Sequence, residues 1–144
     1  MTGIHRTAGL KSAATLIFAV LALAGCAMMG MDGKVTLSGA NEVPANASYA
    51  SGTSTIVIGA DKSVTGSVNV TGMTATMAHI HMAAAGKNGP VILPFPKTAD
   101  NTFAPAAGAK LTDAQYASFK AGDLYINVHS AAFPAGEVRV QLKP

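Results

Sequence analysis

Three histidines are the residues of this sequence best placed to do chemistry. His79 and His81 lie two positions apart in a segment, residues 76–82, whose pattern predicts a β-strand. Side chains two apart on a strand emerge on one face, with Cα atoms about 6.5 to 7 Å apart. Two imidazoles can converge from that spacing on one metal ion, since zinc binds such nitrogens at about 2.0 to 2.1 Å. The pattern is also typical of a solvated polar face or of histidines hydrogen-bonded to backbone.

Further ligands would come from the same strand and from a second one. Met77 shares the face of the histidine pair, and a thioether ligand favours Cu(I). His129 belongs to a predicted strand, residues 124–130, whose alternate aliphatic side chains point inward, so its ring shares the opposite face with Asn127. If the two strands are neighbours, three imidazoles can meet, a ligand set that catalytic sites use with one open position. Asn127 could then orient a ligating ring, or simply hydrogen-bond across the sheet.

Composition and charge restrict the class of protein. The 144 residues suffice for one domain, and with 49% hydrophobic and 12% charged residues they are too apolar for a disordered chain. A single cysteine rules out a disulfide scaffold and a cysteine-based zinc finger. Residues 26–144 hold 8 Lys and Arg against 7 Asp and Glu, a net charge of +1. A nearly neutral domain lacks the electrostatic footprint of a nucleic-acid binder, so we expect no nucleic-acid partner.

The first 25 residues have the features of a bacterial lipoprotein signal peptide. Two basic residues precede an apolar run at 12–23 that is short for a membrane span. The run leads into Leu-Ala-Gly-Cys, so the only cysteine, Cys26, falls where such a signal places its lipid-bearing residue. We expect Cys26 to be the acylated first residue of the mature chain, anchored in a lipid bilayer, with 26–34 as a tether. An ordinary secretory signal with a chance cysteine and an uncleaved anchor helix are the alternatives.

The predicted location follows from this signal. A lipid-anchored chain would lie in the bacterial cell envelope and face the periplasm or the outside. Ala27 follows the cysteine, where an Asp often retains such lipoproteins at the inner membrane. Its absence favours the outer membrane.

Residues 35–144 form the predicted domain, and their pattern is that of short strands. β-Branched residues alternate with small polar ones, and Gly or Pro interrupts the pattern about every 8 to 12 residues, as in a β-sandwich or barrel. The predicted strands are residues 35–37, 54–58, 64–70, 76–82, 91–95, 124–130 and 137–142. In the last strand, alternation predicts that Glu137, Arg139 and Gln141 face outward.

One short helix interrupts the strands. Thr112 and Gln115 are spaced as a capping box, residues 113–120 continue the helix, and Gly122 can end it. No nucleophile elbow, zinc-protease helix or phosphate-binding loop motif occurs in the sequence. Glu42, in a predicted loop, is a candidate oxygen ligand or binding contact, or else a residue that pins the loop to the sheet by a hydrogen bond.

Five segments occur in an order and spacing that are specific to one family. They are LSGANEVP at 37–44, AHIH at 78–81, GKNGPV at 86–91, YINVHS at 125–130 and FPAGEVRVQL at 133–142. Together they resemble the CHRD domain, which is named after its occurrence in chordin and is common in bacterial secreted proteins. The resemblance covers about residues 35–143 and implies an all-β fold, an antiparallel Greek-key β-sandwich. It implies no established activity for a bacterial member, but its pattern includes all three histidine positions.

A looser similarity concerns copper enzymes. A His-x-His strand in a Greek-key sandwich is similar to the copper strand of copper/zinc superoxide dismutases. Those enzymes need a fourth copper histidine and a disulfide, whereas this chain has three histidines after residue 26 and one cysteine.

Three functions therefore remain open. The first is a metal-binding envelope protein, for copper rather than zinc, in storage, resistance or delivery, with His79, His81, His129 and Met77 as ligands. The second is a metal-free module that binds a protein or glycan. The third is a copper-dependent redox enzyme, against which the missing fourth histidine argues.

Overall fold

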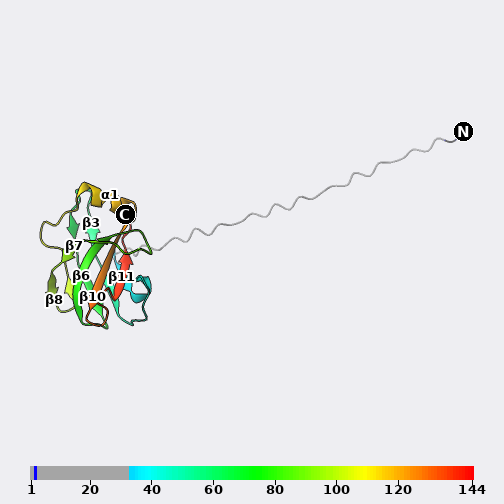
Figure 1. The fold of residues 1–144 in the computed structure, drawn as a ribbon. Coiled ribbons are helices and arrows are strands. Elements are labelled where there is room, and N and C mark those ends of the chain that lie inside the picture. Colours follow the sequence, from blue (N-terminus) through cyan, green and yellow to red (C-terminus); the bar gives the residue numbers. More distant parts are fainter. Residues whose placement is uncertain (1, 3–32) are drawn as a thin grey trace.

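The computed structural model describes Thr2 and residues 33–144 (Figure 1). The predicted signal peptide, Cys26 and most of the predicted tether lie outside the described residues. In chain order the elements are β1 (Val35–Ser38), the 3-10 helix η1 (Gly39–Asn41), β2 (Ser51–Ser54), β3 (Val57–Ile58), β4 (Val64–Thr65), β5 (Val68–Thr71), β6 (Ala75–Met82), β7 (Val91–Phe95), β8 (Lys97–Ala99), β9 (Thr102–Phe103), α1 (Asp113–Lys120), β10 (Leu124–Ser130) and β11 (Val138–Gln141).

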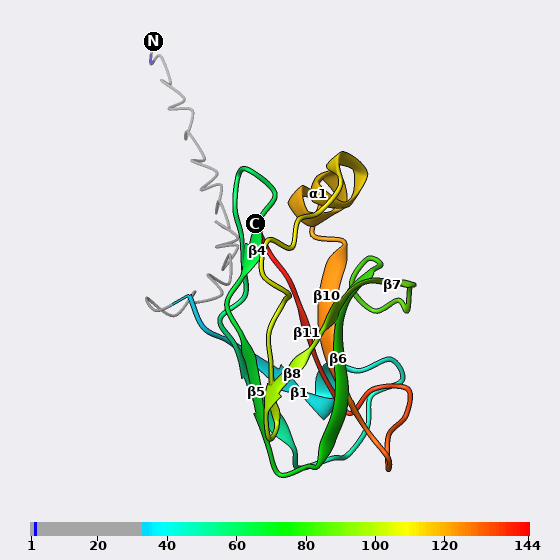
Figure 2. The same ribbon diagram turned by 90° about the vertical axis from the view of Figure 1, so that its left-hand side faces the viewer.

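Nine strands form one sheet. Their order is β7-β6-β10-β11-β1-β2-β5-β9-β8, while β3 and β4 pair separately, and every pairing is antiparallel. Figure 2 shows β6, β10 and β11 along one side of the molecule, β5 along the other, and α1 at one end. The prediction of an all-β antiparallel fold with one short helix is confirmed.

The sheet nearly closes on itself at Pro96. β7 ends at Phe95 and β8 begins at Lys97, so the two end strands of the sheet are consecutive in the chain. The amide of Ala104 donates to the Pro96 carbonyl at 3.1 Å. One short segment thereby pairs with β6 at one end and with β9 at the other, and the sheet wraps around a single core.

Side chains from strands on all sides of the wrapped sheet fill this core. Strand residues that point inward recur with period two, as the alternating pattern predicts. The buried apolar set includes Leu37 of β1, Val68 and Val70 of β5, Ala78 and Ile80 of β6, Phe103 of β9, Leu124, Ile126 and Val128 of β10, and Val138 of β11. In β6 this inward set leaves the histidines at odd-numbered positions on the outer face.

Two predicted strands are divided in the structure. The segment expected as a strand at 54–58 splits between β2 and β3, and the one expected at 64–70 splits between β4 and β5. Gly66 marks the second break: its φ is +102°, and a Cβ there would collide with the carbonyl of Thr55. The backbones approach so closely because the Thr55 amide donates to the Ser67 carbonyl at 2.8 Å. The short strands β8 and β9 were not predicted, since they depend on the closure at Pro96.

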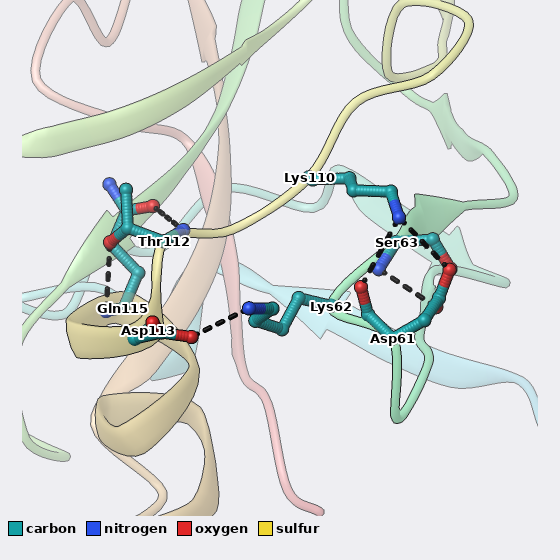
Figure 3. A network of polar contacts seen from close by, with 7 residues as sticks. All are labelled: Asp61, Lys62, Ser63, Lys110, Thr112, Asp113 and Gln115. Carbon is teal, nitrogen blue, oxygen red and sulfur yellow. Dashed lines mark hydrogen bonds and ion pairs between the residues drawn. The ribbon is translucent and has the colours of Figure 1, made fainter.

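Helix α1 begins and ends where the sequence predicts. The Gln115 amide donates to the Thr112 hydroxyl at 3.2 Å, and the Thr112 amide donates to the Gln115 side chain at 2.8 Å, which completes the capping box (Figure 3). Lys62 pairs with Asp113 in the first turn at 2.6 Å, and Gly122 follows with φ +79°. In the part of the chain that the structure describes, no helix is long and apolar enough to cross a membrane.

The outer face of β10 and β11 is covered rather than open to solvent. All seven residues of β10 are buried, on both faces of the sheet. Glu137 and Arg139 point away from the core, as alternation predicts, but they are 5% and 2% exposed because other segments cover that face. The β6–β7 loop, residues 83–90, covers Arg139 through Asn88 and Lys87. Glu137 instead accepts a hydrogen bond from the Ser48 hydroxyl at 2.6 Å.

Candidate metal centre

Strand pairing brings the three histidines together. β6 and β10 are neighbours, with His81 opposite Tyr125, His79 opposite Asn127 and Met77 opposite His129. The two strands thus meet the condition under which three imidazoles can converge. His79 and His81 stand on the outer face of β6, and His129 stands on the same face of β10, two residue pairs along the ladder from His79.

The rings of these residues, the histidine cluster (His79, His81 and His129), form one compact group. The Nδ1 atom of His79 lies 3.1 Å from Nε2 of His129. The ring of His81 is centred 5.5 Å from that of His79 and 6.2 Å from that of His129. Each residue offers one ring nitrogen such that all three lie within 4.8 Å of one another.

Two backbone carbonyls orient the buried rings. The Nδ1 atom of His81 lies 2.9 Å from the carbonyl oxygen of Gly89, and Nδ1 of His129 lies 3.0 Å from that of Pro134. A carbonyl only accepts, so each Nδ1 carries the proton and each Nε2 is left with a free lone pair. Histidines that ligate metals are held in this way, by a second ring nitrogen that donates to a carbonyl.

One of these lone pairs has no hydrogen-bond partner. The Nε2 atom of His81 is buried and unpartnered among the described residues, which is costly for a polar atom unless a ligand satisfies it. The Nε2 atom of His129 accepts from His79 Nδ1 when the two rings form a hydrogen bond. A metal ion would bind that lone pair of His129, and His79 would bind it through Nδ1 in the tautomer that carries its proton on Nε2.

The electrostatics of the cluster favour neutral rings. Burial, together with the neighbouring His129 and His81, lowers the pKa of His79 to about 4. Burial also lowers the pKa of His129, against the opposing effect of its hydrogen bond to Pro134. Metal binding requires the deprotonated imidazole, and these two rings are already in that form at neutral pH.

The separations fit one ion after a small adjustment. Two nitrogens at about 2.1 Å from a common ion lie at most about 4.2 Å apart. The 3.1 Å pair meets this limit, and the upper bound of 4.8 Å exceeds it by about 0.6 Å, so a small shift of the rings brings all three nitrogens within reach of one ion.

Met77 lies beside the cluster at the surface. Its side chain is 49% exposed and lines a shallow hollow of about 320 Å³, which is open to solvent. His79 reaches the same hollow from β6. The other residues of the hollow are Thr76, Ala78, Pro94, Phe95, Pro96, Lys97 and Phe103. A thioether and one of the candidate ligand rings thus share an exposed edge of the site.

Asn127 and Glu42 lie behind the cluster rather than in it. Asn127 is buried, its Nδ2 donates to the carbonyl of Ala135 at 3.4 Å, and its Oδ1 has no partner. Glu42 is also buried with an unpartnered Oε1, and a Cβ on Gly136 would lie 2.6 Å from both side chains. Burial raises the pKa of Glu42 to about 7, against the opposing charge of Arg139. The rings are oriented by Gly89 and Pro134, not by Asn127.

Sequence reasoning missed the residues that hold the cluster in place. Tyr125 stacks on His81 with ring centroids 4.8 Å apart and planes at 11°, and Arg139 lies 3.4 Å over the Tyr125 ring. The orienting carbonyls belong to Gly89-Pro90 and Phe133-Pro134 turns. Those turns are visible in the sequence as GKNGPV and FPAGEV, but the pattern does not show which strand they fold over.

Comparison with known proteins agrees with the pattern of the five segments. The family model described as CHRD domain matches residues 34–142, a range that includes all the residues of the cluster. No curated protein and no solved structure matches the chain.

Proposed function

The chain belongs to the CHRD domain family, and we propose that it is a lipid-anchored envelope protein that binds a transition metal through His79, His81 and His129. The observation that carries the proposal is the convergence of three ring nitrogens within 4.8 Å. The proposed role is storage, resistance or delivery of the metal, with copper rather than zinc as the ion.

The orientation of the rings supports metal binding over a metal-free module. A purely structural histidine would satisfy both ring nitrogens, because a buried polar atom without a partner is destabilising. His81 satisfies only Nδ1 and leaves Nε2 unpartnered. Because the pKa values of His79 and His129 are lowered, these two rings are neutral at neutral pH and the three rings do not repel one another as cations.

Three features support copper, and in particular Cu(I). Imidazoles bind both zinc and copper, but a thioether such as Met77 is a ligand for Cu(I). No carboxylate joins the group that could hold the ion among the described residues. The buried guanidinium of Arg139 lies 3.4 Å from the Tyr125 ring, which stacks on His81 with centroids 4.8 Å apart, and its repulsion is half as large for a monovalent ion as for a divalent one.

The anchor is a separate part of the proposal. It is supported by the Leu-Ala-Gly-Cys sequence at 23–26 after a basic and then apolar leader. Mass spectrometry of the wild-type mature chain should find an acylated Cys26 at its first position, and Cys26→Ala should abolish acylation. A free thiol at Cys26, or a mature chain that starts elsewhere, would refute the anchor and leave the metal site untouched.

Metal titration of an unlipidated Cys26→Ala protein tests the site. Cu(I), held by a competing chelator, and Zn²⁺ are titrated into this protein, into a variant that also carries His129→Ala, and into a control with Thr53→Ala. Thr53 is an exposed residue of β2, which is separated from β10 in the sheet by β11 and β1. Loss of a ligand should weaken binding by more than about 100-fold, since even the residues behind metal ligands change affinity by 10- to 100-fold.

The outcomes separate the competing functions. Tighter binding of Cu(I) than of zinc, lost with His129→Ala and kept with Thr53→Ala, would support the proposal. Equal affinity with and without His129 would remove that ring from the site. Binding of neither metal would favour the module that recognises a protein or glycan.

A further inference from the structure

Arg139 is a buried cation whose placement calls for a function. Its side chain is 2% exposed and is the largest of the fully buried side chains. Among the described residues, no carboxylate lies within 4.0 Å of its guanidinium, although Glu42 is near enough to interact with its charge. A buried charge without a close counterion is costly, so packing alone does not account for it.

The guanidinium of Arg139 contacts both the β6–β7 loop and the Tyr125 ring. Its Nη1 donates to Asn88 Oδ1 at 3.0 Å and its Nη2 donates to the Lys87 carbonyl at 2.8 Å, which fixes the β6–β7 loop over the sheet. Its carbon atom lies 3.4 Å from the centre of the Tyr125 ring. Nη2 also donates to the side-chain oxygen of Gln141 at 3.4 Å, and this second bond fixes the plane of the guanidinium.

Both contacts lead to His81. The Tyr125 ring, on β10 between β6 and β11, stacks on the His81 ring. The loop supplies Gly89, whose amide donates to the Tyr125 hydroxyl at 3.2 Å and whose carbonyl accepts from His81 Nδ1 at 2.9 Å. Arg139 therefore reaches His81 through the ring stack and through the loop, and the two routes meet at Gly89.

We propose that Arg139 is a positioning residue for His81: it fixes the ring plane through Tyr125 and the ring tautomer through the loop, so that Nε2 faces the metal. The proposal rests on the proposed metal-binding function for its purpose, but the positioning exists in the metal-free protein. Lysine cannot replace arginine here, because a point charge neither stacks as a plane nor donates in a fork.

The test compares Arg139→Lys with a matched control, Val138→Ala. Val138 is the neighbouring residue of β11 and is fully buried on the core side, so its truncation perturbs the same strand without touching the loop. The first readout is nitrogen NMR of the His81 ring in metal-free protein. The second is Cu(I) affinity by chelator competition, both measured on the unlipidated full chain.

We expect wild type and Val138→Ala to show one His81 tautomer, with Nδ1 protonated and Nε2 free. Arg139→Lys should show averaging of both tautomers and a 10- to 100-fold loss of Cu(I) affinity. An unchanged tautomer and affinity in Arg139→Lys would overturn the proposal. So would an equal change in Val138→Ala, since that would mean a general loss of order in the strand.

A second variant keeps the proposal testable if Arg139→Lys does not fold. Asn88 is exposed, and Asn88→Ala removes one acceptor of Arg139 and the loop's bond to the Val43 carbonyl. It should change the His81 tautomer in the same direction by a smaller amount, and no change would overturn the proposal. If wild type binds no metal, the proposed function fails, and the tautomer readout alone decides whether Arg139 positions His81.

Discussion

Glu42→Gln is expected to stabilise the protein at pH 8 and to leave its stability nearly unchanged at pH 4.5. The carboxyl group is 7% exposed and its Oε1 has no partner among the described residues. Burial therefore disfavours the ionised form and raises its pKa from 4.5 to about 7, even though Arg139 attracts the negative charge. Gln keeps nearly the same shape and cannot ionise.

The sign and size of this stability difference follow from the number of protons that the folded and unfolded chains bind. Below pH 4.5 the carboxyl is protonated in both the folded and unfolded states, so wild type and variant differ little. Between pH 4.5 and about 7 the unfolded chain releases a proton that the folded chain retains, and stability falls as the pH rises. Over this interval, at roughly 1.4 kcal/mol per pH unit, wild type loses about 3 kcal/mol that the Gln variant keeps.

Urea denaturation of both proteins at pH 4.5, 6, 7 and 8 measures this difference. The pH dependence that comes from His79 and His129 is common to both proteins and cancels when one free energy of unfolding is subtracted from the other. The difference should grow between pH 4.5 and 7 and then level off. A difference that is constant across the series would refute the reasoning, because it would mean that Glu42 ionises alike in folded and unfolded protein.

Three further substitutions test the helix cap, a close backbone approach and a surface ion pair. Thr112→Ala removes the hydroxyl that accepts from Gln115 and should lower the free energy of unfolding by about 1 kcal/mol in urea denaturation; no loss would contradict a working cap. Gly136→Ala puts a Cβ within 2.6 Å of Glu42 Oε1 at a φ of +132° and should cost more than about 2 kcal/mol; a Tm within a degree of wild type would argue against this close approach. Lys62→Met breaks an ion pair whose carboxylate is almost fully exposed, so the loss of stability should be small and disappear in 1 M salt, and a loss that salt does not change would contradict an electrostatic origin.

Local rules predict the parts of this fold that depend on near neighbours. The face shared by His79 and His81 follows from the period of a strand, and the start of α1 follows from the three-residue spacing between Thr112 and Gln115. Both features involve residues within one element. The sequence does not predict that β6 and β10 are neighbours, since nothing local fixes which strands pair.

The rest depends on contacts between distant segments. The burial of Arg139 arises because a loop about 51 residues away in sequence covers it and accepts its hydrogen bonds, and alternation alone counts such a position as solvent-facing. The orientation of His81 depends on the Gly89 carbonyl, a backbone group whose direction no side-chain pattern reveals. The break at Gly66 likewise reflects the approach of another backbone, at Thr55.

The closure of the sheet at Pro96 bears on how the protein behaves at high local concentration. Exposed edge strands can pair with those of another molecule and start aggregation. Here the two end strands, β7 and β8, run into each other within one stretch of chain, and Pro94 lacks an amide to offer to an incoming strand. Lys97 and Asp100 add charges beside that edge. Copies held on one membrane surface by the proposed anchor would therefore meet without joining their sheets.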